Sequence, residues 1–233
     1  MQASNLFDLP SHLPFHGYFD PEATPWEWVK AIREALASFE FIAEGIKQPL
    51  PPGVMIEGDV FLHPTVTLPP YAVIQGPAWI GAHTEIRPGA FIRGNVIVGE
   101  GCVLGNSCEY KNCLLMDKVE SAHFNYVGDS ILGTGAHLGA GVVLANLRLD
   151  RGLVPVTWED GRALSGLKKL GAMVGEYAEV GCNAVLQPGA IIGKRAIVAP
   201  TVAYGGFWGR RQSLLIPLGL EHFRVVKIFS SFR

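Results

Sequence analysis

IQGPAW-IGAHTE-IRPGAF-IRGNVI-VGEGCV-L, residues 74–104, has an aliphatic residue at every sixth position. Most of these residues are followed, four positions later, by a small or β-branched residue such as Ala78, Ala90 or Cys102. The aliphatic positions run through Ile56, Leu62, Leu68, Ile74, Ile80, Ile86, Ile92, Val98 and Leu104, continue at Tyr110 and Met116, and return as Val174, Val180, Leu186, Ile192 and Val198. Between the two runs, Val127, Leu132, Leu138 and Leu144 keep the spacing after a one-residue slip.

A period of six matches neither an α-helix, which repeats near 3.6, nor a strand, which repeats near 2. It fits a prism with three short strands per turn, in which the aliphatic residue fills the interior and the small residue lies where the chain turns. Gly and Pro collect at the expected corners, as in Arg87-Pro88-Gly89 and Gln187-Pro188-Gly189. An ordinary β-sandwich would need this long in-register series to arise by chance. The repeat predicts an all-β fold, a left-handed parallel β-helix of hexapeptide repeats over residues 51–205.

Two segments interrupt the repeat, and a third follows it. Residues 1–50 contain an expected helix that starts at Thr24-Pro25-Trp26-Glu27, the pattern of an N-cap, an N1 proline and a capping-box glutamate. Its apolar side comprises Trp28, Val29, Ile32, Ala35 and Leu36. We expect this helix to cap the open first coil, because an uncapped solenoid end exposes strand edges and core. Residues 147–169 form a loop excursion with a hairpin near Asp160-Gly161, and residues 206–233 form a C-terminal cap or tail.

Composition narrows the classes of function. Of the 233 residues 48% are hydrophobic, and the formal net charge is −2, so a packed core is expected and a basic surface for nucleic acid is not. No apolar run is long enough for a membrane span, and no secretion signal is evident. Cys102, Cys108, Cys113 and Cys182 lack zinc-site spacing. We therefore expect reduced cysteines in a cytoplasmic protein.

Two features suggest where chemistry could occur. Gln75, Arg93 and Lys111 are eighteen residues apart and should lie in one outward column. Arg93 and Lys111 would then repel each other on adjacent coils, and an anion such as a sugar phosphate would relieve the repulsion. An ordinary solvated face is the alternative. His123 lies near the slip in the repeat, where a side chain can be redirected, although a lone histidine is more often an ordinary surface residue.

Three motifs resemble a known family. They are Gly105-Asn106-Ser107-Cys108-Glu109-Tyr110-Lys111, His123-Phe124-Asn125-Tyr126-Val127-Gly128-Asp129 and Leu138-Gly139-Ala140-Gly141. Together they resemble the acetyltransferase half of the bifunctional UDP-N-acetylglucosamine pyrophosphorylase/glucosamine-1-phosphate N-acetyltransferases, and more closely the β-helix of related sugar-1-phosphate nucleotidylyltransferases. The resemblance covers about residues 50–205.

The resemblance implies a role for each matching residue. It makes His123 the general base that takes a proton from the sugar amine, as suits a neutral imidazole. It implies a substrate site of Arg87 or Arg93, Lys111, Tyr126, His137, Asn146 and Lys169, and an acetyl-CoA contact at Ala140 and Cys182. Arg87 has the family's Arg-Pro-Gly motif, whereas Arg93 has the right spacing to Lys111. His137, Leu147 and Cys182 replace an asparagine, a tyrosine and a serine of the family, which leaves the sugar open.

The expected function is acetyl-CoA-dependent N-acetylation of an amino-sugar phosphate, with glucosamine-1-phosphate as the default acceptor, in the biosynthesis of UDP-N-acetylglucosamine. The resemblance implies a homotrimer and no metal. The nucleotide-binding half of the family is not expected here, because residues 1–50 lack its Gly-rich loop; a separate nucleotidyltransferase is then a possible partner. A β-helical carbonic anhydrase would need a His-x-x-x-x-His pair, which the seven histidines do not supply. A non-catalytic trimerising or regulatory β-helix is the other alternative.

Overall fold

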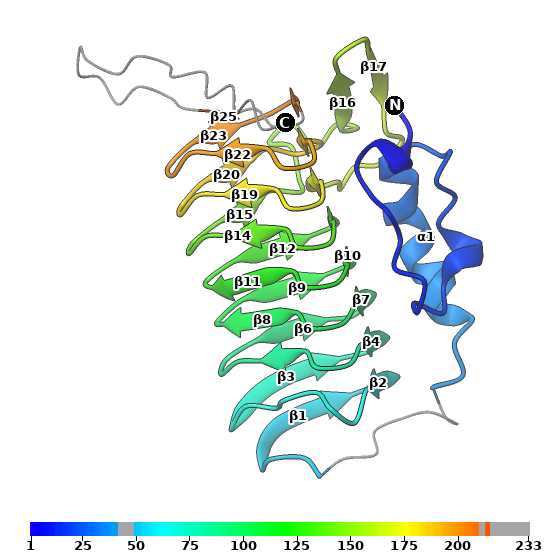
Figure 1. Cartoon of the computed structure of the whole chain (residues 1–233), viewed down its shortest axis with the longest axis vertical. Coiled ribbons are helices and arrows are strands. Elements are labelled where there is room, and N and C mark those ends of the chain that lie inside the picture. The colour runs from blue at the N-terminus through cyan, green and yellow to red at the C-terminus, as the bar shows by residue number, and fades with distance from the viewer. Residues whose placement is uncertain (42–48, 210–212, 215–233) are drawn as a thin grey trace, which may run out of the picture.

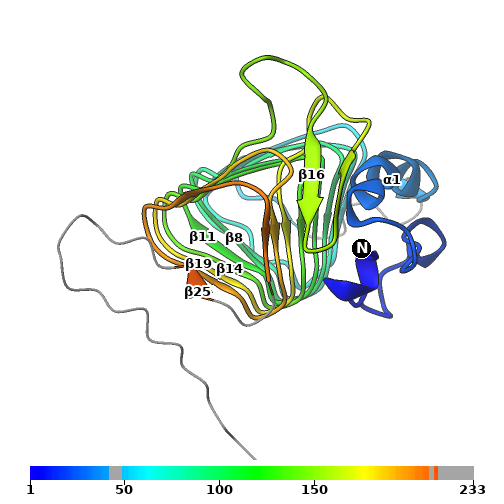
Figure 2. The same cartoon turned by 90° about the horizontal axis from the view of Figure 1, so that it is seen from above.

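The computed structural model describes residues 1–41, 49–209 and 213–214, the last two as backbone. Within these ranges, three parallel sheets form the sides of a triangular prism (Figures 1 and 2). Sheet A consists of β2 (Val60–Leu62), β4 (Ala78–Ile80), β7 (Val96–Val98), β10 (Cys113–Leu115), β13 (Ile131–Leu132), β18 (Met173–Val174), β21 (Ile191–Ile192) and β24 (Phe207–Trp208).

Sheets B and C complete the prism. Sheet B consists of β1 (Gly53–Glu57), β3 (Tyr71–Gln75), β6 (Phe91–Arg93), β9 (Glu109–Lys111), β12 (Tyr126–Gly128), β15 (Val143–Leu144), β20 (Val185–Leu186) and β23 (Ala203–Tyr204). Sheet C consists of β5 (Glu85–Ile86), β8 (Val103–Asn106), β11 (Glu120–His123), β14 (His137–Leu138), β19 (Glu179–Val180), β22 (Ile197–Val198) and β25 (Ser213–Leu214). The chain visits B, then A, then C. Seen from the C-terminal end in Figure 2, it runs clockwise as it rises towards the viewer, so the predicted left-handed parallel β-helix is confirmed.

The interior is filled as the repeat predicts. Ile74, Ile92 and Leu104 are fully buried, and the small residues Ala90 and Cys102 are buried where the chain turns inward. Because strands on successive coils pair in register, these side chains stack along the prism axis. The turn between sheets C and B is called the C–B edge below, and the turn between sheets B and A the B–A edge.

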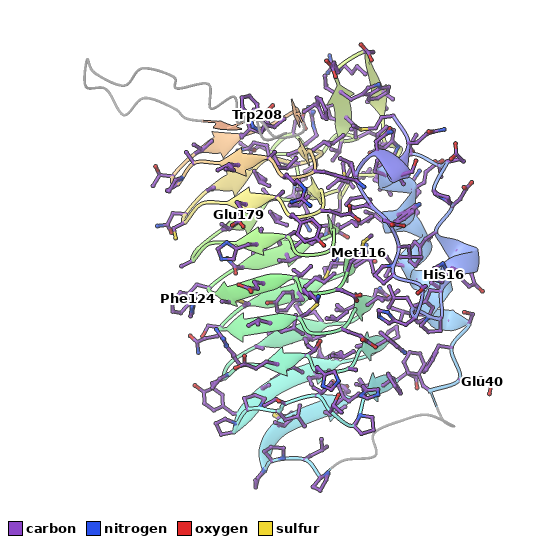
Figure 3. All side chains as sticks on the ribbon, in the orientation of Figure 1. His16, Glu40, Met116, Phe124, Glu179 and Trp208 are labelled. Carbon is purple, nitrogen blue, oxygen red and sulfur yellow. The ribbon has the colours of Figure 1, made fainter. Side chains whose placement is uncertain are left out.

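One slip was predicted near His123, whereas the repeat slips twice. Val98 pairs with Leu115 rather than with Met116, so one residue is lost between Tyr110 and Leu115. Val127 pairs with Tyr110 and Leu132 pairs with Leu115, so a second residue is lost between Val127 and Leu132. Met116 faces outward and packs against the N-terminal segment (Figure 3). Two adjacent apolar residues fit the pattern at this point, and the periodicity alone does not distinguish them.

The N-terminal segment covers the side of the prism. It contains two 3-10 helices, η1 (Ala3–Asn5) and η2 (His16–Tyr18), and one α-helix, α1 (Pro25–Ala37). The predicted capping box is confirmed, because Thr24 and Glu27 bond each other's backbone at the start of α1. The expectation that this helix caps the first coil is wrong, since α1 packs against β7 and β10 of sheet A (Figure 1).

The outer face of sheet A explains this location. A continuous column of outward apolar residues runs along it, comprising Phe61, Trp79, Ile97, Leu114, Ile131, Met173, Ile191 and Phe207. An apolar patch of this extent is unfavourable in water. Leu6, Phe7 and Trp28 from the N-terminal segment cover it and form a second core with it.

The loop excursion completes the same layer. The predicted hairpin is confirmed as β16 (Pro155–Trp158) and β17 (Gly161–Leu164), which pair antiparallel. Val154 and Val156 are buried in the second core, and the Trp158 ring packs 5.7 Å from that of Trp26. No helix in the described part of the chain has the length and apolar character needed to cross a lipid bilayer.

Candidate active site

His123 ends β11 and lies at the C–B edge. Its side chain is exposed, and its ring lies 6.4 Å from that of Phe124, which is itself 61% exposed (Figure 3). Neither ring nitrogen of His123 bonds to a residue in the described ranges. An exposed imidazole with both nitrogens accessible is able to exchange a proton with a bound molecule.

Ala140 and Cys182 follow His123 along the same edge. The His123 carbonyl accepts a hydrogen bond from the Gly141 N–H at 3.0 Å, and the Ala140 carbonyl accepts one from the Asn183 N–H at 2.8 Å. His123, Ala140 and Cys182 therefore stand on three successive coils, about 4.8 Å apart from one coil to the next. The Cys182 side chain is exposed. The structure brings together the residues predicted for the base and for the thioester.

A polar cluster occupies the B–A edge. The Lys111 Nζ lies 3.0 and 3.2 Å from the two carboxylate oxygens of Asp129, whose side chain is only 6% exposed. The Asn112 Nδ2 donates to the same carboxylate at 2.9 Å. The Asn146 Nδ2 donates to Asp129 and, at 3.1 Å, to the hydroxyl of Tyr126. The structure thus joins the predicted Lys111, Tyr126 and Asn146 through a carboxylate that the sequence analysis did not identify.

The phenol of Tyr126 remains protonated at neutral pH. Partial burial raises its pKa, and the nearby negative charges of Asp129 and Glu109 raise this pKa further. Since its oxygen already accepts a hydrogen bond from Asn146, its own proton is available to donate outward.

Arg93 lies beside this cluster on sheet B. It pairs with Gln75 across the strands as predicted, and its guanidinium forms an ion pair with Glu109. Lys111 is likewise paired with Asp129. Each cation therefore has a carboxylate partner within the chain, which relieves the repulsion expected between Arg93 and Lys111 without a bound anion. A bound anion would have to compete with Glu109 for Arg93.

The other three predicted substrate residues lie in three different parts of the prism. Lys169 is exposed at the return of the excursion, beside Leu170, whose N–H donates to the Asn146 carbonyl at 2.9 Å. It therefore joins the B–A edge. Arg87 lies at the C–B edge, where its guanidinium forms two hydrogen bonds with Glu85 at 3.0 and 3.2 Å. His137 begins β14, and its side chain lies on the outer face of sheet C.

Within the described residues, no group of three or more His, Cys, Asp or Glu side chains is arranged to hold a metal ion. The His137 Nδ1 lies 2.7 Å from a carboxylate oxygen of Glu179, its partner on the next strand of sheet C. This is a pair and not a cluster, so it has too few ligands for a structural zinc site.

The comparisons with known proteins agree with one another. A family model described as the GMPPB C-terminal domain matches residues 74–154. The bifunctional sugar-1-phosphate nucleotidylyltransferase/acetyltransferase of Sulfurisphaera tokodaii is 37% identical over 111 residues, which are 45% of this chain and 28% of that protein. The bifunctional protein GlmU of Methanococcus vannielii is 33% identical over 199 residues, which are 85% of this chain and 46% of that protein. The chain is homologous to the C-terminal β-helix region of these bifunctional proteins.

The chain spans less than half the length of these two bifunctional relatives. Among solved structures, the UDP-N-acetylglucosamine acyltransferase of Francisella novicida aligns with a TM-score of 0.41 and 16% identity, over 63% of this chain and 52% of that one.

Within this homologous β-helix region, the structure favours Arg93 over Arg87 as the companion of Lys111. Arg93 belongs to β6, which pairs directly with the strand of Lys111, whereas Arg87 lies across sheet B at the C–B edge. Asp129 and Glu109 were missed, although both stand inside motifs that carry the family resemblance. The signal for Asp129 was its position eighteen residues after Lys111, the spacing of the predicted column, since opposite charges on adjacent strands attract each other.

Proposed function

We propose that the chain is an acetyl-CoA-dependent N-acetyltransferase that acts on an amino-sugar phosphate. The observation that supports this best is the arrangement of sheet B, which has His123, Ala140 and Cys182 along one edge and Arg93, Lys111 and the Tyr126 network along the other. A strand of three residues, about 10 Å, separates the two edges. A sugar with its phosphate towards the cations and its amine towards His123 would lie across this face.

The proposed reaction needs one base and one oxyanion donor. The amine nitrogen attacks the thioester carbonyl carbon while a ring nitrogen of His123 takes its proton. The carbon–sulfur bond then breaks, and the departing thiolate of CoA recovers a proton from the imidazolium. The backbone N–H of Ala140 donates no hydrogen bond to any described residue, so it is available to the oxyanion. Cys182 lies one coil further along, on the side proposed for CoA.

Glucosamine-1-phosphate is the acceptor we propose first, in the biosynthesis of a nucleotide sugar. The test is acetyl-CoA-dependent release of thiol with glucosamine-1-phosphate, and with glucosamine-6-phosphate and glucosamine as comparisons. Turnover confined to the 1-phosphate supports the phosphate site at Arg93 and Lys111. Turnover that is equal with all three would show that the phosphate is not recognised, and would overturn that part of the proposal.

A non-catalytic β-helix is the second candidate, favoured by two observations. Arg93 and Lys111 are both paired with carboxylates, and the His123 ring has no orienting partner among the described residues. Binding of acetyl-CoA, measured by calorimetry, separates the two candidates. A scaffold has no reason to bind it, whereas the proposed enzyme must.

We also propose a homotrimer that works in the cytoplasm, with a separate nucleotidyltransferase as a partner. Since the N-terminal segment covers sheet A, the open faces for self-association are those of sheets B and C. Buried, unpaired Cys102, Cys108 and Cys113 suit a reducing compartment. Sedimentation equilibrium gives the number of protomers directly, and a monomer at working concentration would contradict the trimer.

A further inference from the structure

Asp129 is a buried carboxylate that bonds polar side chains from the coils before and after its own. Lys111 and Asn112 reach it from the coil before, and Asn146 from the coil after. A carboxylate with 6% exposure would be costly without such partners. Asp129 also has a φ of 49°, a left-handed conformation that Asp and Asn tolerate better than most residues.

The hydrogen bonds around Asp129 have a fixed direction. An ionised carboxylate only accepts, so the amide nitrogen of Asn146, and not its oxygen, must face Asp129. The second hydrogen of that nitrogen points at the Tyr126 hydroxyl. Two consequences follow for the open side of the cluster. The Asn146 Oδ1 is presented as an acceptor, and the Tyr126 O–H is presented as a donor.

We infer that Asp129 is a positioning residue that sets this polarity. Through it, Lys111 and Tyr126 present two donors and Asn146 presents one acceptor. This pattern matches a ligand with anionic oxygens beside a hydroxyl group, which is the chemistry of the phosphate end of a sugar phosphate. The inference deepens the proposed function and rests on it.

Asp129→Asn is the decisive variant. Asparagine keeps the shape and the left-handed backbone, but it removes the charge from Lys111 and adds a donor that conflicts with Asn112 and Asn146. We expect the KM for the sugar phosphate to rise about 10- to 100-fold, the range for loss of a hydrogen bond to a charged group, while the KM for acetyl-CoA stays within about twofold.

Asp117→Asn is the matched control. It makes the same substitution at the turn between sheets A and C, where the Asp117 carboxylate accepts a hydrogen bond from the Glu100 N–H at 2.8 Å and lies 3.3 Å from the His12 Nε2. Asp117 does not contact Tyr126 or Asn146, so the polarity of the open side should survive. The variant is expected to unfold at lower temperature with an unchanged KM. An equal rise of KM in both variants would reduce Asp129 to a structural role and overturn the inference.

A second readout is independent of turnover. Because the charge of Asp129 helps to raise the pKa of Tyr126, Asp129→Asn should lower the pKa of this phenol. Ultraviolet titration of the folded protein follows the ionisation of its tyrosines. The difference between the curves with and without Tyr126→Phe gives the contribution of Tyr126. Absence of turnover in the wild type with every acceptor would reject the proposed function alone. An unchanged Tyr126 titration in folded Asp129→Asn would reject the inference alone.

Discussion

Gly128→Ala should disable the polar cluster without changing any charge. Gly128 ends β12, and a Cβ built on it would lie 2.5 Å from the Tyr126 hydroxyl oxygen and 2.8 Å from the Asn146 Nδ2. Its φ lies outside the left-handed region, so alanine is compatible with the backbone. The methyl group would therefore force the Tyr126 and Asn146 side chains apart by up to about 1 Å, which breaks their 3.1 Å hydrogen bond.

The size of the effect follows from this displacement. Loss of the hydrogen bond and local overpacking together should lower the free energy of unfolding by about 2–4 kcal/mol. A 1 Å displacement of a positioning group can cost about 100-fold in rate, so we expect kcat/KM for the sugar phosphate to fall by about 10- to 100-fold. The KM for acetyl-CoA should change little, because Ala140 and Cys182 lie at the other edge of sheet B.

Steady-state thiol release gives both KM values, and thermal unfolding gives the stability. Gly17→Ala is the matched control, since a Cβ there has no atom within 4 Å. Folded Gly128→Ala with kcat/KM within about threefold of the wild type would refute the reasoning, because a displaced Tyr126–Asn146 pair would then be irrelevant to the acceptor.

Three further predictions follow. Burial raises the pKa of Cys102 to about 12 and also raises the pKa of Cys113. A thiol reagent at neutral pH should therefore label only the exposed Cys182 among the four cysteines. Rapid labelling of the buried thiols in folded protein would contradict the packing. Thr24→Ala removes the side-chain half of the capping box and should lower the free energy of unfolding by about 1 kcal/mol, measured by urea denaturation, with Thr157→Ala as an exposed control. The raised pKa of Tyr126 keeps the phenol protonated in the folded state above the ordinary tyrosine value of about 10, where the unfolded chain ionises. Stability should therefore fall as pH rises past that value, and less steeply in Tyr126→Phe; identical slopes would count against a buried phenol.

The sequence predicted the prism because the six-residue period leaves few physical alternatives. It did not reveal the first of the two slips, since Leu115 and Met116 are adjacent, apolar and both buried, one inside the prism and one outside. The location of α1 was predictable in principle. Trp79 and Ile97 are eighteen residues apart in an outward position, and such a column requires a cover.

The candidate site was predicted one residue at a time and not as a network. Motif resemblance identified Lys111, Tyr126 and Asn146, but not that Asp129 joins them. The eighteen-residue column places Asp129 level with Lys111. In the structure one coil has seventeen residues at this point, so Gly128 pairs with Lys111 and Asp129 is level with Asn112. Side-chain pairing across coils depends on that register, which the sequence left one residue uncertain.

The most direct test of the central claim is acetyl-CoA-dependent thiol release with glucosamine-1-phosphate by His123→Ala. His16→Ala is the control, because His16 lies on the N-terminal segment far from the C–B edge (Figure 3). Loss of general-base catalysis should reduce kcat by about 100- to 10,000-fold with acetyl-CoA binding retained, and His16→Ala should behave as the wild type. Full turnover by folded His123→Ala would contradict the account.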